Sequence, residues 1–359
     1  MPPPPHGHRN GAVSMADLAR ELGVSMTTVS RALSDHHSIG PATKQRVQQL
    51  ARKLDYQPNY VAAALRKGQS RLFGVVVPYI EGGFFPAVIQ GIEQAASQAG
   101  FSVIVCQSYD NTQLERRNLA TLLHAQVAGI LLSVARNTAQ YQHFDKVRGR
   151  GVPIVFFDRI PECTDITAVL LDDFEGGYFS TKHLLAQGYR RIAHLAGPEH
   201  LNIYRNRCRG YQAALQENGA SDHRLVNELI RYTDMKQEGG AAAMHELLML
   251  PQPPDAVFAA GDYCALGAMQ VALKKGLRVP QDLGISGFSN EKFTAATQPS
   301  ITSVDQRCPE MGKAAARLLL KMLEIGPAFI PRQIVLRPEL VIRASSSFTS
   351  EKMMLQTSG

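Results

Sequence analysis

The sequence predicts a small all-α domain at the N-terminus, followed by an α/β domain with parallel sheets that is divided into two lobes. Between residues 14 and 69 the apolar residues follow helical spacing. From residue 71 onward, short apolar runs alternate with amphipathic stretches, a pattern typical of parallel sheets covered by helices. This second region of about 275 residues is too long for one small doubly wound sheet, so we expect two lobes with a cleft between them.

Residues 14–33 are predicted to form two short helices joined by a tight turn. Ala19 is small where the helices must approach each other, and Gly23 can adopt the positive φ that a sharp turn requires. Ser25 is placed to cap the second helix, whose buried face carries Val29. This spacing favours a helix-turn-helix that binds nucleic acid, and a helical hairpin without that role is the alternative.

Two more helices are predicted before the α/β region. Pro41 begins a longer one with lysine and arginine residues on its outer face. Asn59 can cap a short helix that ends at Gly68. So short a helix is marginally stable by itself, because nucleation is costly and few hydrogen bonds follow it. We therefore expect a helix-turn-helix domain at 14–58 and a hinge helix with its linker at 59–70.

Charge is distributed unevenly along the chain. Residues 1–69 contain nine Lys/Arg and four Asp/Glu, a net charge of +5, whereas all 359 residues together carry +7. The α/β region is thus close to neutral. A basic small domain beside a nearly neutral large one is the charge distribution expected of a nucleic-acid-binding protein.

A set of short motifs runs through the N-terminal region: Met15-Ala16-Asp17-Leu18-Ala19, Gly23-Val24-Ser25, Thr28-Val29-Ser30-Arg31, Tyr56-Gln57-Pro58-Asn59 and Ala62-Ala63-Ala64-Leu65. They resemble the LacI/GalR (lactose-repressor) family of bacterial transcription regulators, and the resemblance continues to about residue 343. It implies a periplasmic-binding-protein-like domain whose two lobes are joined by three crossovers. It also implies a homodimeric regulator, most often a repressor, that binds a palindromic operator in double-stranded DNA under the control of a small effector.

The resemblance also implies which residues contact DNA. Base readers on the recognition helix would be Met26, Thr27 and Arg31, and phosphate contacts would come from Ser14, Ser25, Thr28, Ser30 and Asn59. Leu65 would insert into the central base step of the minor groove, and Arg66 would lie along that groove. An apolar side chain on a basic helix can unstack a base step, at a cost of a few kcal/mol. The alternative for Leu65 is an ordinary apolar residue of a linker helix.

In the α/β region the expected elements alternate. Strands are expected at 72–77, 101–106, 129–133, 154–157, 192–196, 256–259 and 284–287, and helices at 86–99, 114–125, 138–149, 174–187, 206–218, 238–249, 263–275 and 307–324. The family resemblance implies one lobe at 71–171 and 300–330 and a second at 172–299 and 331–345, with tails at 1–13 and 346–359. Residues 73–78 and 91–96 faintly echo 192–198 and 210–215. We favour a generic α/β pattern over lobe symmetry as its origin.

Ligands of open α/β sheets bind beyond the carboxyl ends of the strands. The candidate effector residues at such places are Phe85, Asp110, Asp158, Arg159, Arg205 and Asp262. An aromatic face with Asp and Arg side chains suits a polyhydroxylated ring, so a sugar is the expected effector. The alternative is that Asp158-Arg159 and Arg205 form a structural ion pair at the lobe interface. Gly261 and Ser289-Asn290 depart from the family pattern, which also leaves sugar derivatives and nucleobases open.

Other function classes lack support in the sequence. The phosphate-binding, nucleophile-elbow and zincin motifs are absent, which argues against an enzyme, a cofactor or a metal site. Asp172, Asp173 and Glu175 are interpreted as charges at a helix start rather than as a catalytic pair. A sugar- or nucleobase-binding protein without a DNA role is the main alternative.

Location is predicted from the same composition. No run of 18 apolar residues exists, and the N-terminus lacks the apolar segment of a secretory signal. Five dispersed cysteines without a C-x-x-C pair indicate reduced thiols. We therefore expect a cytoplasmic protein with no membrane contact.

Overall fold

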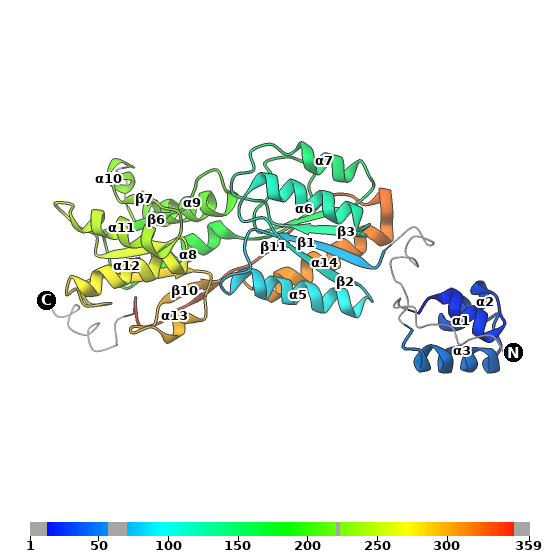
Figure 1. Ribbon diagram of the computed structural model, residues 1–359. Coiled ribbons are helices and arrows are strands. Elements are labelled where there is room, and N and C mark those ends of the chain that lie inside the picture. The colour runs from blue at the N-terminus through cyan, green and yellow to red at the C-terminus, as the bar shows by residue number, and fades with distance from the viewer. Residues whose placement is uncertain (1–12, 57–69, 220–222, 348–359) are drawn as a thin grey trace. The chain divides into compact units, whose positions relative to one another are not determined.

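The computed structural model describes residues 13–56, 70–219 and 223–347 (Figure 1). It divides into two compact units between Ser70 and Arg71. The predicted hinge residues Asn59, Leu65 and Arg66 lie outside the described residues. Among the helices that are described, none is long and apolar enough to cross a membrane.

The first unit consists of three helices, α1 (Met15–Leu22), α2 (Met26–Leu33) and α3 (Pro41–Lys53). Its core contains Leu18 and Val29, both fully buried, and Val47 of α3. Gly23 ends α1 with φ 66°, the left-handed conformation that the turn before α2 requires. The predicted helix-turn-helix is therefore confirmed.

The second unit contains two sheets, each with helices packed against it (Figure 1). The first sheet has the order β11-β5-β4-β3-β1-β2, and every pairing in it is parallel. Its strands are β1 (Leu72–Val77), β2 (Ser102–Gln107), β3 (Gly129–Leu132), β4 (Ile154–Phe157), β5 (Ala168–Leu171) and β11 (Gln333–Leu336). The helices of this lobe are α5 (Phe84–Gln98), α6 (Thr112–His124), α7 (Gln142–Arg148) and α14 (Cys308–Ile325), which the short 3-10 helix η1 (Gly326–Ala328) follows.

The second sheet has the order β12-β10-β9-β8-β6-β7, with only β12 antiparallel to its neighbour. Its strands are β6 (Ile192–Ala196), β7 (Ile230–Tyr232), β8 (Ala256–Ala259), β9 (Gly284–Phe288), β10 (Thr302–Asp305) and β12 (Glu339–Val341). The helices of this lobe are α8 (Asp173–Ala186), α9 (Asn202–Glu217), α10 (His223–Glu228), α11 (Gln237–Leu248), α12 (Asp262–Lys274) and α13 (Phe293–Ala296). The predicted fold class, two lobes with parallel sheets, is confirmed.

Two of the predicted lobe boundaries are wrong. β10 pairs with β9 of the second sheet, so residues 300–305 belong to the second lobe rather than the first. β11 pairs with β5 of the first sheet, so residues 331–336 belong to the first lobe. The backbone hydrogen bonds of these two strands, rather than the chain position of α14, decide the lobe to which each segment belongs.

The start of the predicted tail at 346–359 is also wrong, because the folded domain includes residue 346. Ser345 and Ser346 are fully buried in the second lobe. The Ser345 hydroxyl donates to the carbonyl of Ile285 at 2.6 Å, and the Ser346 hydroxyl lies 2.6 Å from that of Thr302. These contacts anchor the end of the domain to the second sheet.

The sequence echo falls on equivalent elements of the two lobes, which corrects its interpretation as a generic pattern. Residues 73–78 and 192–198 cover the first strand of each lobe, β1 and β6, and both sheets then continue in the same order. Gly91 of α5 and Gly210 of α9 stand at matching helix crossings. An added Cβ would overlap the Pro309 carbonyl in the first lobe and the Phe174 carbonyl in the second. The repeated glycine thus permits the same close helix packing twice.

Candidate functional site

Helix α2 presents a polar face that its own unit leaves uncovered. Met26 is 52% exposed, and Thr27 and Arg31 are exposed beside it. The guanidinium of Arg31 has no hydrogen bond or ion pair with any residue that the structure describes, and only the backbone carbonyl of this residue accepts hydrogen bonds. The three predicted base readers therefore share an accessible surface, while Val29 of the same helix fills the core.

The serines at the helix starts serve as caps. The Ser14 hydroxyl donates to the Asp17 carboxylate at 2.6 Å, while the Ser14 oxygen accepts from the Asp17 backbone N–H at 3.3 Å. The Ser25 oxygen accepts from the Thr28 backbone N–H at 3.1 Å and lies 2.9 Å from the Thr28 hydroxyl. Ser30 is half-buried. The caps fix the first turns of α1 and α2, whose backbone N–H groups are favourable places for an anion.

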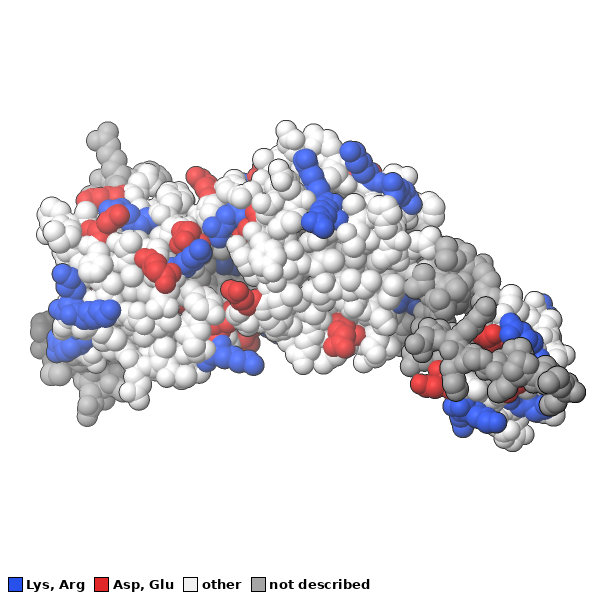
Figure 2. Space-filling view, in the orientation of Figure 1, with Lys and Arg blue, Asp and Glu red and all other residues white. Residues whose placement is uncertain are grey.

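A cavity of about 180 Å³ lies between the two lobes of the larger unit. Four of the six predicted effector residues line it: Phe85, Asp158, Arg159 and Asp262. The sequence prediction missed further aromatic and polar residues around the cavity: Tyr79, Glu81, Phe84, Tyr204, Arg207, Tyr263, Ser289, Glu291 and Gln306. Figure 2 shows acidic and basic side chains gathered at the waist between the lobes, beside broad uncharged surfaces.

Arg207 is the most constrained side chain of the cavity. Its Nε donates to Asp173 Oδ1 at 2.8 Å, and its Nη1 donates to the Ala260 carbonyl at 2.8 Å. Its guanidinium carbon lies 3.7 Å from the ring centroid of Phe288. Both members of the ion pair are buried, with side chains 4% exposed. Arg207 is therefore held as a fixed donor and cation that lines the cavity.

Asp110 does not line the cavity, contrary to its prediction as an effector residue. It lies behind Arg159, which donates to Asp110 Oδ1 at 2.6 Å. Arg136 also contacts this carboxylate, since its backbone N–H donates to Oδ1 at 2.9 Å. Tyr109 and Asp110 both have positive φ, in the turn that follows β2. Asp110 thus orients Arg159.

Arg205 is also outside the cavity, which corrects the second predicted effector residue. Its Nη1 lies 2.5 Å from Glu162 Oε1, in an ion pair that joins the two lobes at the surface. Arg205 and Arg207 are two residues apart on α9, so a helix turns them about 200° away from each other. Arg207 takes the inward position.

Polar contacts across the cleft hold the lobes together. Glu291 of the second lobe accepts from the Gly83 backbone N–H at 2.7 Å, and burial raises the pKa of this glutamate. Asn202 donates to the Asp158 carbonyl at 3.0 Å and accepts from the Ile160 N–H at 3.2 Å. These hydrogen bonds involve backbone groups that lie beside the cavity. A change in the separation of the lobes therefore also changes the shape of the cavity.

Asp262 carries a buried carboxyl group at the start of α12. Its Oδ1 accepts from the Ser303 hydroxyl at 2.7 Å, and its Oδ2 accepts from the Glu291 N–H at 2.8 Å. Burial raises the pKa of Asp262 to about 6, against these hydrogen bonds, which favour the charged form.

Stability should consequently depend on the ionisation of Asp262. Because its pKa in the folded protein lies above its unfolded value, its stabilising contribution is complete below pH 4 and is lost as pH rises through about 6. Between pH 4 and 7, wild type should lose about 3 kcal/mol of unfolding free energy relative to Asp262→Asn. Urea unfolding across this range measures the difference, and parallel pH profiles would contradict the assignment.

Comparisons with known proteins find matches to both units of the chain. Residues 14–59 match the model of bacterial regulatory proteins of the lacI family, and residues 181–346 match that of a periplasmic binding protein-like domain. The HTH-type transcriptional repressor CytR of Escherichia coli (strain K12) is 32% identical over 335 residues, which cover 93% of this chain and 96% of the relative.

Two solved structures extend the similarity to three dimensions. The lac repressor dimer bound to operator and the anti-inducer ONPF has a TM-score of 0.83 and 26% identity, covering 94% of this chain and 100% of that chain. The transcriptional regulator CelR in complex with cellobiose has a TM-score of 0.70 and 30% identity, covering 93% and 99%. These relatives are transcriptional regulators, which confirms the predicted class and argues against an enzyme. The chain belongs to the lacI family of bacterial regulatory proteins.

Proposed function

We propose that this chain is a cytoplasmic transcriptional repressor that binds a palindromic operator as a homodimer, under the control of a small effector in the cleft. The exposed face of α2 carries the proposal. It presents accessible Met26, Thr27 and Arg31 on a small unit whose buried core contains only a few residues. The similar lac repressor structure, a dimer on its operator, supports the oligomeric state and the DNA partner.

On DNA, α2 would enter the major groove. Arg31 suits bidentate hydrogen bonds to guanine, and Met26 and Thr27 offer apolar and hydroxyl contacts to neighbouring bases. The capped first turns, with Ser14, Ser25, Thr28 and Ser30, would lie against phosphates. Asn59, Leu65 and Arg66 remain the proposed phosphate contact, wedge and minor-groove residue of the hinge.

The proposed effector is a sugar with one ring. The cavity combines the faces of Phe85 and Tyr204 with the carboxylates of Asp158 and Asp262 and the guanidinium of Arg207, which suit a polyhydroxylated ring. Its volume of about 180 Å³ favours one ring over two. The cellobiose complex of CelR supports the sugar class.

Control of DNA binding would follow from lobe closure. An effector that contacts both lobes favours one closure angle over another, and the first lobe continues directly into the hinge at residue 70. The spacing of the two hinges in the dimer would then change, and with it the affinity for the operator.

Substituting Arg31 tests the base-reading role. Duplexes selected from a random pool by the full-length wild type define the preferred site, and dissociation constants are then measured for every single-base change in it. Arg31→Ala should lose about 1–3 kcal/mol on the preferred site and become indifferent to the base at one position of each half-site. Equal weakening on all duplexes, with specificity retained, would make Arg31 a phosphate contact and contradict the assignment.

A further inference from the structure

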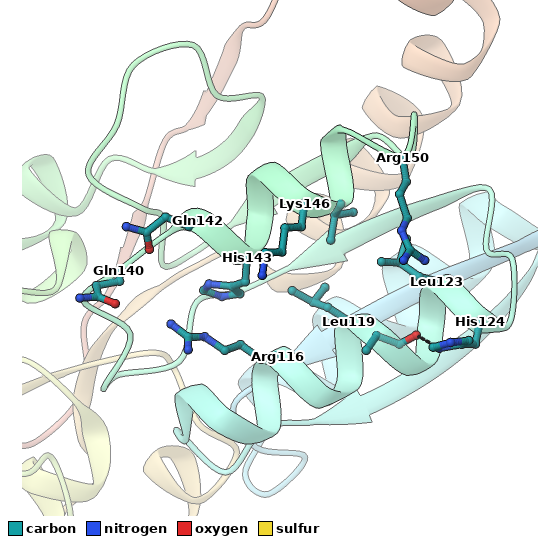
Figure 3. Close-up of a pocket in the computed structure, with 11 residues that line it drawn as sticks. Arg116, Leu119, Leu123, His124, Gln140, Gln142, His143, Lys146 and Arg150 are labelled. Carbon is teal, nitrogen blue, oxygen red and sulfur yellow. Dashed lines mark hydrogen bonds between the residues drawn. The ribbon is translucent and has the colours of Figure 1, made fainter.

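A groove on the first lobe lies apart from the cleft between the lobes. It occupies about 500 Å³ between α6 and α7, and none of the residues that line it also lines the cleft (Figure 3). This volume falls within the range of small-molecule sites, about 300–1,000 Å³. The groove therefore has room for a ligand of its own.

Three cationic side chains enter this groove from both of its sides. Figure 3 shows Arg116 extending from α6, and Lys146 and Arg150 extending from α7 and the residues after it, into the space between the helices. All three are exposed, and none forms a hydrogen bond or ion pair with a residue that the structure describes. No aspartate or glutamate is among the lining residues. The groove thus concentrates positive charge.

His143 forms part of the wall of the same groove. Its side chain is 9% exposed, and its Nε2 lies 2.8 Å from Glu115 Oε1. Its Nδ1 is buried, so this atom does not face the open groove. The imidazole therefore shapes the groove rather than supplying a contact to a ligand.

The position of His143 is fixed from behind. Glu115 accepts from the Ala135 backbone N–H at 2.7 Å and from the Thr138 hydroxyl at 2.9 Å, as well as pairing with His143. The imidazole therefore cannot turn without breaking this network. Figure 3 places the ring close to Arg116 at one end of the groove.

The wall opposite the charges is apolar. Ala120 and Leu123 of α6 supply accessible apolar surface beneath the cationic side chains, and the buried Leu119 and Val147 lie below them. A free inorganic ion would leave this apolar surface in contact with water, whereas an organic group on the ion would cover it. A ligand that fits the site therefore needs an anionic group for the cationic side chains and an apolar group for this wall.

We propose that the α6–α7 groove binds a small phosphate monoester with an apolar organic group. The phosphate oxygens accept hydrogen bonds from Arg116 and Lys146. The organic group packs against Ala120 and Leu123. The site is separate from the sugar cleft, so it is independent of the effector proposed there.

Calorimetric titration of the full-length protein with phenyl phosphate tests the proposal. Wild type should bind the probe saturably, and more tightly than inorganic phosphate. The double variant Arg116→Gln/Lys146→Gln should weaken binding at least about tenfold, because it removes two charge-assisted contacts while leaving exposed, unpaired positions.

Arg117→Gln is the matched control, since Arg117 is an exposed arginine of the same helix that does not line the groove. It should leave binding unchanged. Absence of saturable binding to wild type would overturn the proposal. Equal losses in Arg117→Gln, or full binding by the double variant, would overturn it too, by placing the probe elsewhere.

Discussion

Replacing Arg207 by leucine should lower the free energy of unfolding of the α/β unit by about 3–5 kcal/mol. The substitution leaves the Asp173 carboxyl buried without its guanidinium partner, leaves the Ala260 carbonyl without a donor, and removes the cation from the face of Phe288. Denaturant unfolding of the full-length protein measures the loss.

Arg205, two residues before Arg207 on α9, provides a control for this experiment. Arg205→Leu removes a partly exposed ion pair with Glu162 and should cost no more than about 1 kcal/mol. Two variants two residues apart on α9 thus separate a buried ion pair from a surface one. Equal stabilities of Arg207→Leu and Arg205→Leu would contradict the central position of Arg207.

The Arg207→Leu deficit should also grow with pH. Burial raises the pKa of Asp173 to about 7 even beside Arg207, and removing the guanidinium raises it further. A carboxyl with a raised folded pKa loses its stabilising contribution as pH rises through that pKa, and the variant binds its proton over a wider range. The difference between wild type and variant should be larger at pH 8 than at pH 6.

Leu18→Ala should abolish operator binding while leaving the α/β unit intact. Leu18 is fully buried in a three-helix unit whose core holds few other large side chains. Truncating a buried leucine costs about 2–5 kcal/mol, which approaches the whole stability of so small a domain. Since the chain divides at residue 70, the larger unit should keep its own unfolding transition and its cleft.

Circular dichroism and a DNA titration together measure the effect of Leu18→Ala. Met26→Ala serves as the control for folding, because Met26 is half exposed and contributes little to the core. The helices should melt early in Leu18→Ala and stay intact in Met26→Ala. Wild-type operator affinity in Leu18→Ala would contradict the role of this unit.

The N-terminal unit was predictable because its signals are local. Ser14, Gly23 and Ser25 set the ends of α1 and α2 within the segment itself, and the structure places the turn at Gly23 and the cap at Ser25 where the sequence predicts them. The buried strands β1, β4 and β8 were predictable for a similar reason, as continuous apolar runs.

The edge strands could not be predicted in this way. β11 alternates exposed and half-buried residues, and β12 has three residues and begins with an exposed glutamate. Both strands are short, and the sheet that each joins depends on distant partners. The error at residue 331 follows from this dependence for β11.

The cleft was predictable only in part. Asp158 directly follows the buried strand β4, and Asp262 comes shortly after the buried strand β8, so strand ends located them. Arg207 was missed because the choice between it and Arg205 depends on the phase of α9. One signal was available: Arg207 lies at helical spacing between Tyr204 and Tyr211, in the stripe that the helix buries.

Selection of DNA from a random duplex pool tests the central claim most directly. The full-length protein is used, with the bound fraction sequenced at moderate salt in the absence and presence of individual sugars. The proposed function predicts enrichment of one dyad-symmetric sequence, with retention that changes in the presence of one sugar. Retention of all duplexes alike, or of none, at every salt concentration and with every sugar would contradict it.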